Sequence, residues 1–262
     1  MRLVNPARSE TLNPYRQAAS LAWRRLRWDL DPVSWASRRR LRAWRDRHAG
    51  ERTVIVCNGP SLLRSDLGLL EGVFTFGLNK INLLFERSAF RPSCIVSINP
   101  HVIEQNAEFL NETSIPLFLD SVGRPWVQHR PGAVFLHSSH MEGFARDCSV
   151  SVMQSGTVTY VAMQLAYHMG FRRVALIGAD HDFTRRGEPN SVAVAETTDR
   201  DHFDPRYFSV GMKWQLPDLE ESERGYVRAR EVFEQAGGSI VNATAGGKLE
   251  VFERVDLADF VG

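Results

Sequence analysis

Short apolar runs that alternate with helical stretches constrain the fold of this chain more than any other feature. The run Thr53–Cys57 (TVIVC) is rich in β-branched residues, which is typical of a strand buried on both faces of a parallel sheet. Comparable runs recur at Val73–Leu78, Ser93–Ile98, Ile115–Leu119, Ala133–Leu136, Arg173–Gly178 and Ser239–Asn242. We therefore predict a doubly wound, Rossmann-like α/β fold with a mainly parallel sheet.

Two later segments have the pattern of amphipathic helices. Ser155-Gly156-Thr157 opens the first, and Gly170 ends it in the position that favours glycine. Its apolar residues follow 3, 4 and 7 spacing at Val158, Val161, Ala162, Leu165 and Met169. A second helix of about 219–236 ends at a pair of glycines. Both helices fit the predicted α/β alternation.

The composition is that of an ordinary globular protein. The 262 residues are 43% hydrophobic and 24% charged, which suits one large domain or two small ones. Three cysteines without a close pair argue against a disulfide framework or a zinc knuckle. No apolar run approaches the roughly 20 residues of a membrane span, and the N-terminus lacks the apolar core of a signal peptide. We expect a cytoplasmic protein.

Residues 1–50 form a basic segment that differs from the rest of the chain, and we call it the N-terminal arm. The arm holds 12 Arg, four acidic residues and four of the six Trp, so its formal charge is +8 while residues 51–262 carry −7. We predict two helices in it, about 14–29 and 33–48, separated at Asp31-Pro32. The arm can contact an anionic membrane surface or pack its Trp and Leu side chains on the main domain. The overall charge of +1 argues against a nucleic-acid partner.

Residues 51–262 are predicted to be a nucleotide-binding catalytic domain. Between Asp182 and Pro217 they contain a polar stretch with little periodicity. A stretch of this length inside a compact domain is more often a functional lid or insertion than a passive connection. We therefore predict a lid near residues 183–217.

Polar residues follow several of the predicted strands. Asn58-Gly59-Pro60-Ser61 follows the first, Asn79 the second, Asn99 the third, and Asp180 the strand that ends at 178. In parallel sheets, ligands bind at the carboxyl ends of the strands. Three asparagines there indicate a neutral ligand part such as a base or ribose, although each Asn can also be a turn residue.

The turns lack the known phosphate-binding fingerprints. There is no G-x-G-x-x-G, and Gly246-Gly247-Lys248 lacks the spacing of a P-loop. Ser61 can cap the helix that follows it and form a modest anion site. Ser155, Gly156 and Thr157 offer a second helix N-terminus for a phosphate, or an ordinary cap.

Two segments carry candidate catalytic groups. Asp180-His181-Asp182 has the D-x-D pattern by which many sugar-nucleotide enzymes hold Mg²⁺ or Mn²⁺; a strand-end Asp that binds ribose or caps a turn is the alternative. His202, flanked by Asp201 and Asp204, can be a general acid or base near neutral pH. Its alternative is a solvated loop histidine.

The motifs taken together resemble a broad bacterial and archaeal family, named motility accessory factor or 6-hydroxymethylpterin diphosphokinase-like. The pieces that carry the resemblance are His48–Arg52, Asn58–Leu62, Ser155–Phe171, Leu176–Phe183, His202–Phe208 and Asn242–Phe252. The core is also similar to bacterial sialyltransferases that use a CMP-activated donor. That similarity implies that Asn58, Gly59, Ser61, Asn79 and Asn99 surround the nucleotide, that Ser155–Thr157 lies near the donor phosphate, and that His202 is the base.

The resemblance implies two activities. The first is a glycosyltransferase of cell-surface glycan synthesis, with a nucleotide-activated sugar such as a CMP-nonulosonate as donor and a glycan or lipid-linked acceptor. The second is a diphosphokinase that transfers pyrophosphate from ATP to a hydroxymethylpterin-like compound with Mg²⁺, held by Asp180 and Asp182. A nucleotide-binding scaffold without catalysis is a third possibility. We place the glycosyltransferase first.

Overall fold

An eight-stranded parallel sheet forms the centre of the molecule. The computed structural model describes residues 13–182, 188–195 and 198–262. The sheet has the strand order β12-β11-β8-β1-β2-β3-β4-β5, and every pairing in it is parallel. Its strands are β1 (Arg52–Val56), β2 (Phe74–Leu78), β3 (Cys94–Ser97), β4 (Leu117–Asp120), β5 (Ala133–Leu136), β8 (Arg173–Ile177), β11 (Ser239–Asn242) and β12 (Glu253–Arg254). The predicted Rossmann-like α/β fold is confirmed.

The strands are buried on both faces, as their sequences predict. In β1 and the residue after it, Ile55 and Cys57 join one hydrophobic layer, while Val54 and Val56 join the other. Successive side chains of a strand point to opposite faces, so a run without polar residues fits only a covered sheet. The sequence did not reveal β12, because both of its residues are charged and exposed.

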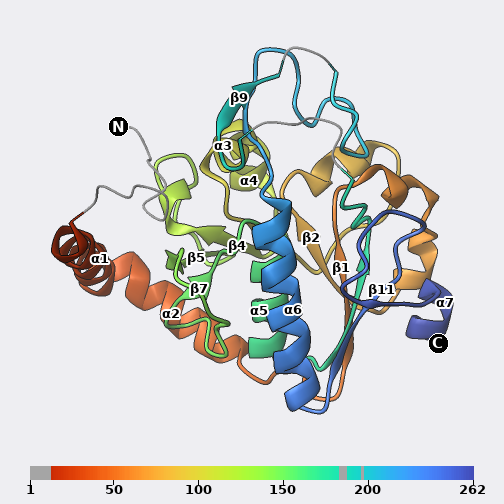
Figure 1. Cartoon of the computed structure of the whole chain (residues 1–262), viewed down its shortest axis with the longest axis horizontal. Helices are drawn as coiled ribbons and strands as arrows, with labels where there is room; N and C mark the ends of the chain where they lie inside the picture. The colour runs from red at the N-terminus through yellow and green to blue at the C-terminus, as the bar shows by residue number, and fades with distance from the viewer. Residues whose placement is uncertain (1–12, 183–187, 196–197) are drawn as a thin grey trace.

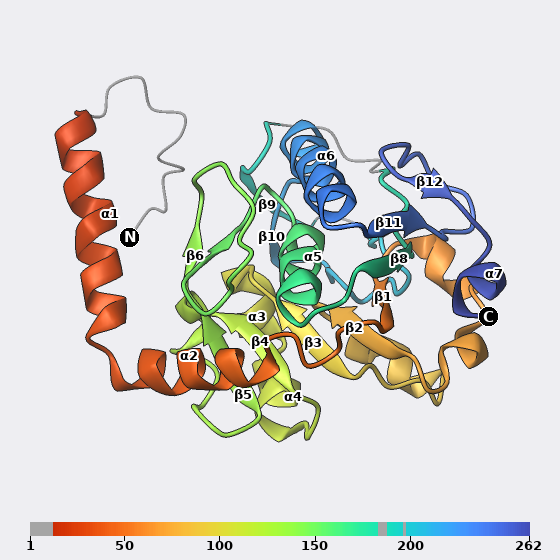
Figure 2. The same cartoon turned by 90° about the horizontal axis from the view of Figure 1, so that it is seen from below.

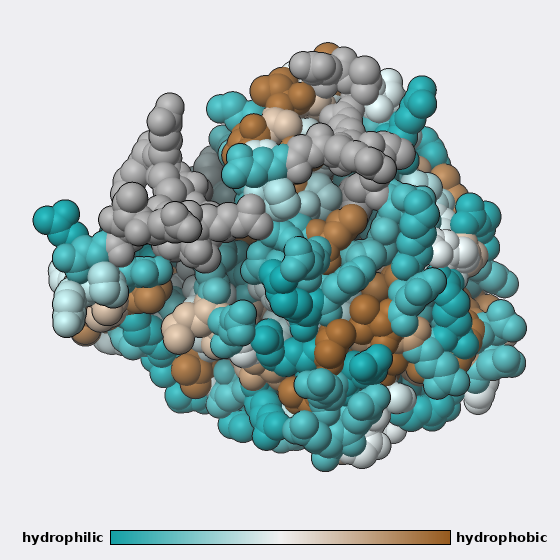
Figure 3. All heavy atoms as spheres, viewed as in Figure 1, coloured by the Kyte–Doolittle hydropathy of each residue, from teal (hydrophilic) through white to brown (hydrophobic). Residues whose placement is uncertain are grey.

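Helices cover the two faces of the sheet. One layer contains α5 (Val158–His168) and α6 (Leu219–Gln235), and the second contains α3 (Pro100–Gln105), α4 (Ala107–Glu112) and α7 (Leu257–Val261). Figure 1 shows α5 and α6 side by side in front of the sheet. The molecular face in this view is mainly hydrophilic, with apolar residues in small groups (Figure 3). No helix of the described segments is long and apolar enough to cross a membrane.

The N-terminal arm forms two helices, α1 (Pro14–Asp29) and α2 (Pro32–Trp44). Asp31 caps α2 by accepting a hydrogen bond from the Val33 amide at 2.8 Å. The second helix is shorter than predicted and ends before the turn of residues 45–50. In Figure 2, α2 lies along the sheet edge and α1 projects from the body.

Helix α2 covers the edge strand β5. The Phe135 amide donates to Ser37 Oγ at 3.1 Å, and Arg40 donates to the Ala133 carbonyl at 3.0 Å. Because an uncovered edge strand offers free amides and carbonyls to other chains, α2 protects the sheet. The packing interpretation of the arm therefore holds for its second helix.

The described part of the predicted lid is a folded insertion. It contains an antiparallel pair, β9 (Val192–Val194) and β10 (Lys213–Gln215). The insertion packs on Val102 of α3 through a small hydrophobic cluster. Its other members are Ala195, Tyr207, Phe208, Trp214 and Leu216. Residues 183–187 and 196–197 of the predicted lid lie outside the described segments. A further short parallel pair, β6 (Ser138–Ser139) and β7 (Val152–Met153), lies beyond β5.

Candidate functional site

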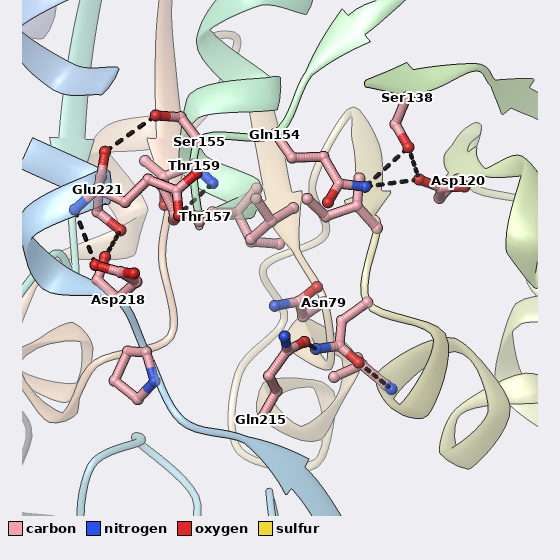
Figure 4. A pocket seen from close by; sticks show the side chains of 18 of the residues that line it. Asn79, Asp120, Ser138, Gln154, Ser155, Thr157, Thr159, Gln215, Asp218 and Glu221 are labelled. Carbon is pink, nitrogen blue, oxygen red and sulfur yellow. Dashed lines mark hydrogen bonds between the residues drawn. The ribbon is translucent and has the colours of Figure 1, made fainter. Parts of the chain in front are cut away.

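A cleft of about 1040 Å³ opens at the carboxyl ends of the central strands. Figure 4 shows part of its lining, with Asn79 after β2, Asp120 at the end of β4, and side chains at the starts of α5 and α6. Most of the residues predicted from sequence line it: Asn58, Gly59, Asn79, Asn99, Ser155, Gly156, Thr157, Asp180, Asp182 and His202. Pro60 and Ser61 do not line it. The fold therefore brings three asparagines, a helix N-terminus and the candidate histidine to one cavity.

The turn after β1 is fixed by close contact with the end of β8. A Cβ atom on Gly59 would lie 2.0 Å from Asp180 Oδ2, so only glycine fits there. Ser61 donates to the same oxygen from its amide at 3.1 Å and from its hydroxyl at 2.6 Å. The prediction that Ser61 caps the following helix is therefore wrong. The cap residue is Gly59, which has no side chain to accept a bond.

Asn58 has a buried oxygen without a partner. Its side chain is 7% exposed, and its Nδ2 donates to the Leu78 carbonyl at 3.0 Å. Its Oδ1 has no hydrogen-bond partner among the described residues. A buried acceptor left unpaired costs about 1–3 kcal/mol. Asn58 therefore brings a fixed amide and an unpaired acceptor to a residue of the cleft wall.

The two other asparagines serve as turn residues and line the cleft as well. Asn79 adopts a left-handed backbone conformation with φ of 49°, and its Oδ1 accepts from the Ser97 hydroxyl at 3.1 Å. Asn99 caps α3 by accepting from the His101 amide at 2.9 Å, and its Nδ2 is 3.3 Å from Gln215 Oε1 of the insertion. The turn and site interpretations of the sequence are thus compatible.

The segment before α5 presents a helix N-terminus to the cleft. Thr157 caps the helix through Oγ1, which accepts from the Thr159 amide at 3.2 Å. Ser155 and Gly156 have φ values of 41° and 71°, and Ser155 Oγ donates to the Glu221 carbonyl at 3.0 Å. The positive end of the helix dipole favours an anion at this place.

The D-x-D carboxylates have separate partners. Asp180 holds the β1 turn through Ser61, whereas Asp182 accepts from Lys248 Nζ at 2.8 Å on the surface. In the described part of the chain, no three His, Cys, Asp or Glu side chains are grouped as metal ligands. Since Mg²⁺ requires near-octahedral oxygen ligands, this arrangement does not fit a metal held by both residues.

His202 forms a dyad with Asp199. Its Nδ1 lies 2.8 Å from Asp199 Oδ2, and the imidazole stacks on the ring of Tyr207 with 3.8 Å between centroids. The side chain is 14% exposed. Of the flanking acids named from sequence, Asp204 is fully buried and instead accepts from Arg206. The Asp199 partner was missed because no local motif marks it.

Lys80, two residues after the end of β2, forms hydrogen bonds that hold the insertion in position. Its Nζ donates to the Tyr207 carbonyl at 2.6 Å and to Gln105 Oε1 at 2.8 Å. The side chain is buried, and burial lowers the pKa of Lys80 to about 8. The Phe203 amide also donates to the Asn58 carbonyl at 2.8 Å. These contacts fix the position of His202 relative to the asparagines.

A polar cluster at the end of β4 was missed by the sequence analysis. Asp120 accepts from the Ser138 hydroxyl and from Gln154 Nε2, the latter at 2.9 Å (Figure 4). Burial raises the pKa of Asp120, against the hydrogen bonds that lower it. The strand-end argument could have found Asp120, which directly follows the predicted strand Ile115–Leu119, but it was applied only to the asparagines and to Asp180.

Comparison with known proteins gives one family and one solved structure. The family model for 6-hydroxymethylpterin diphosphokinase MptE-like proteins matches residues 37–186. The MAf glycosyltransferase from Magnetospirillum magneticum AMB-1 is similar in structure, with 12% sequence identity and a TM-score of 0.48. The match covers 86% of this chain and 39% of that one, so the chain spans about two fifths of its length. No curated protein matches the sequence.

Proposed function

The chain belongs to the 6-hydroxymethylpterin diphosphokinase MptE-like family, and we propose that it is a transferase that binds a nucleotide-activated donor in the cleft. One observation carries the proposal. The cleft combines amide side chains, a helix N-terminus and a histidine oriented by a carboxylate. These groups suit a nucleoside, a phosphate and an acceptor hydroxyl, in that order.

The transferred group in this proposal is a sugar, for example a nonulosonate activated by CMP. The acceptor is a hydroxyl of a cell-surface glycan or of its lipid-linked precursor. The neutral amides of Asn58, Asn79 and Asn99 support binding of a nucleoside, and the start of α5 at Thr157 supports binding of the donor phosphate. Donor and acceptor then meet in one cleft.

His202 is the proposed base. In the proposed reaction the imidazole starts neutral, with its Nδ1 proton donated to Asp199 and its lone pair on Nε2. Nε2 takes the proton of the acceptor hydroxyl as its oxygen bonds to the anomeric carbon. The bond from that carbon to the donor phosphate breaks, and the nucleotide leaves with the electron pair. The positive end of α5 stabilises the charge that develops on the phosphate.

The family description supports a second candidate, a diphosphokinase that uses ATP and Mg²⁺. Mg²⁺ neutralises developing charge in such reactions. The separate partners of Asp180 and Asp182 weigh against a metal held by that pair. A nucleotide-binding scaffold is the non-catalytic alternative. If substitution of His202 leaves the rate of a transfer reaction unchanged, this alternative is favoured.

Helix α1 supports a further part of the proposal, contact with an anionic membrane near a lipid-linked acceptor. Trp23, Leu26 and Leu30 share one side of the helix and are 62%, 48% and 65% exposed. A basic helix with exposed Trp and Leu residues suits the interface of an anionic bilayer.

Calorimetric titration with CMP, CDP, UDP, GDP and ATP, each with and without Mg²⁺, tests the proposed function. We expect metal-independent binding with a preference for CMP. Selective binding of ATP that requires Mg²⁺ would instead establish the diphosphokinase. Binding of none of the five would reject both nucleotide-dependent activities.

A further inference from the structure

The cleft extends past the nucleotide-binding groups to the N-terminal arm. Arg24, Arg27 and Trp28 of α1 line this end, where Trp28 lies beside His137, which follows β5. Their spacing of three and four residues puts them on one face of the helix. With His137, Ser138, His140 and Gln154, which also line the cleft, they form what we call the arm-side subsite.

We propose that the arm-side subsite binds an oxyanion of the acceptor, a carboxylate or a phosphate, through Arg24 and Arg27. The inference rests on the proposed function, because it assigns the acceptor to the end of the cleft that the nucleotide does not need. It gives α1 a role in the site itself.

The arm is held in place at this end. Trp28 is 7% exposed and its ring centroid lies 6.1 Å from that of His137. Arg25, on the adjoining side of α1, donates to the Val150 carbonyl at 2.6 Å and to Asp29 at 2.8 Å. These contacts fix the helix that carries Arg24 and Arg27 against the β6–β7 region, beside which it stands in Figure 2.

Among the described residues, two cations at this end have no counterion. Arg124 forms an ion pair with Asp31, and Glu142 lies 3.4 Å from Arg228. The buried acid at this end, Asp120, already accepts from Ser138 and Gln154. Within the described residues, Arg24 and Arg27 take part in no hydrogen bond or ion pair. Guanidinium groups are well suited to carboxylate and phosphate.

Neutral groups beside the arginines can bind the rest of an acceptor. Burial and the charges of Arg25 and Arg24 lower the pKa of His137 to about 4. Burial also lowers the pKa of His140, and Arg24 acts in the same direction. Both imidazoles are therefore neutral near pH 7.

A buried donor without a partner lies in the same place. Nε1 of Trp28 has no hydrogen-bond partner among the described residues. Gln154 joins this end to the phosphate end, because it directly precedes the Ser155–Thr157 segment. A donor phosphate at Thr157 and an acceptor held at the arm-side subsite would thus share one cavity.

The test compares two double variants of the arm with matched charge and spacing. Arg24→Gln/Arg27→Gln alters the subsite, whereas Arg39→Gln/Arg42→Gln alters two exposed arginines of α2 that do not line the cleft. Inorganic pyrophosphate and glucuronate are titrated into each protein by calorimetry, in the presence of the nucleotide that binds most tightly in the panel. If no nucleotide binds, the proposed function fails and the two probes are titrated into the free protein.

We expect Arg24→Gln/Arg27→Gln to weaken binding of at least one probe about tenfold or more. The Arg39→Gln/Arg42→Gln control should stay within about twofold of wild type, and nucleotide affinity should be unchanged in both. The inference would be overturned if neither probe binds the wild type, or if both double variants lose affinity for the probes equally. A parallel loss of nucleotide affinity in Arg24→Gln/Arg27→Gln would overturn it as well, because the arginines would then belong to the nucleotide site.

Vesicles separate a soluble acceptor group from a lipid headgroup. The same proteins are sedimented with vesicles of phosphatidylcholine containing phosphatidylglycerol. If Arg24→Gln/Arg27→Gln weakens vesicle binding while both soluble probes bind as to wild type, the arginines bind headgroups and the acceptor subsite is rejected.

Discussion

At the residue scale, Asp180 organises the first turn of the cleft. Its Oδ2 receives two hydrogen bonds from Ser61, and it lies against the α-carbon of Gly59. The Asp180 carboxylate thus accepts hydrogen bonds from the protein itself, next to the proposed nucleotide site. Its role is to position Asn58 and Gly59, which line the cleft.

This role predicts different effects for the two acids of the D-x-D segment. Asp180→Ala should destabilise the protein by about 1–3 kcal/mol because buried donors of Ser61 lose their acceptor, and it should weaken nucleotide binding. Asp182→Ala removes only an exposed ion pair with Lys248 and should cost about 0–1 kcal/mol. Denaturant unfolding and nucleotide titration measure both effects. Equal loss of binding in the two variants would indicate a shared metal and contradict this assignment.

The His202–Asp199 dyad predicts a kinetic signature. His202→Gln should slow release of nucleotide from the activated sugar by about 100-fold or more, as removal of a general base does. Asp199→Asn should also reduce the rate, because the tautomer and orientation of the imidazole are no longer fixed. Nucleotide affinity should change little in either. The control is His129→Gln, because His129 is exposed and lies outside the cleft. An unchanged rate in His202→Gln would show that His202 is not the base.

At the element scale, the two helices of the arm differ in what they bury. Helix α2 covers the edge of β5 through Ser37 and Arg40, so its removal would expose a strand edge. Helix α1 leaves Trp23, Leu26 and Leu30 in solvent. A truncation of the whole arm would confuse these two roles, and point substitutions on α1 separate them.

The exposed side of α1 predicts a change in membrane binding without a change in stability. Leu26→Gln/Leu30→Gln should weaken sedimentation with phosphatidylglycerol vesicles about tenfold or more, because two leucines no longer enter the bilayer. The melting temperature should stay the same. Leu63→Gln/Leu69→Gln removes two leucines of similar exposure, 53% and 36%, elsewhere on the surface. Equal vesicle binding by wild type and the α1 variant would reject the membrane contact.

At the scale of the whole molecule, several polar contacts join the insertion to the segments that follow β1, β2 and β3. Lys80 lies at the centre of them, with its Nζ on the Tyr207 carbonyl and 5.2 Å from the ring centroid of Phe208. Tyr207 in turn stacks on His202. The position of the candidate base therefore depends on the docking of a segment that is remote in sequence from the asparagines.

The lowered pKa of Lys80 predicts how this docking affects stability. The pKa is about 8 in the folded protein and 10.5 in the unfolded chain, so the unfolded chain binds more protons between these values and stability rises with pH. The free energy of unfolding of wild type relative to Lys80→Met should increase from pH 8 to pH 10, by at most about 3 kcal/mol. Denaturant unfolding at several pH values measures it. A difference that does not change with pH would contradict the burial of this amine.

The sequence by itself determined the parallel sheet, the main helices and most of the cleft-lining residues. It could do so because the pattern of burial along a strand or helix is local, and because the carboxyl ends of parallel strands meet at one edge. Asn58, Asn79 and Asn99 could thus be grouped before any contact was known, although their roles in binding remain a prediction.

Only the tertiary structure decided which side chains meet at and around the cleft. Ser61 contacts Asp180, Lys80 contacts Tyr207, and Arg24 of the arm faces the β4–β5 end. These partners are far apart in the chain, and their meeting depends on strand order and on the docking of the arm and the insertion. Such contacts follow from the packing of whole elements, which leaves no periodic signal in the sequence.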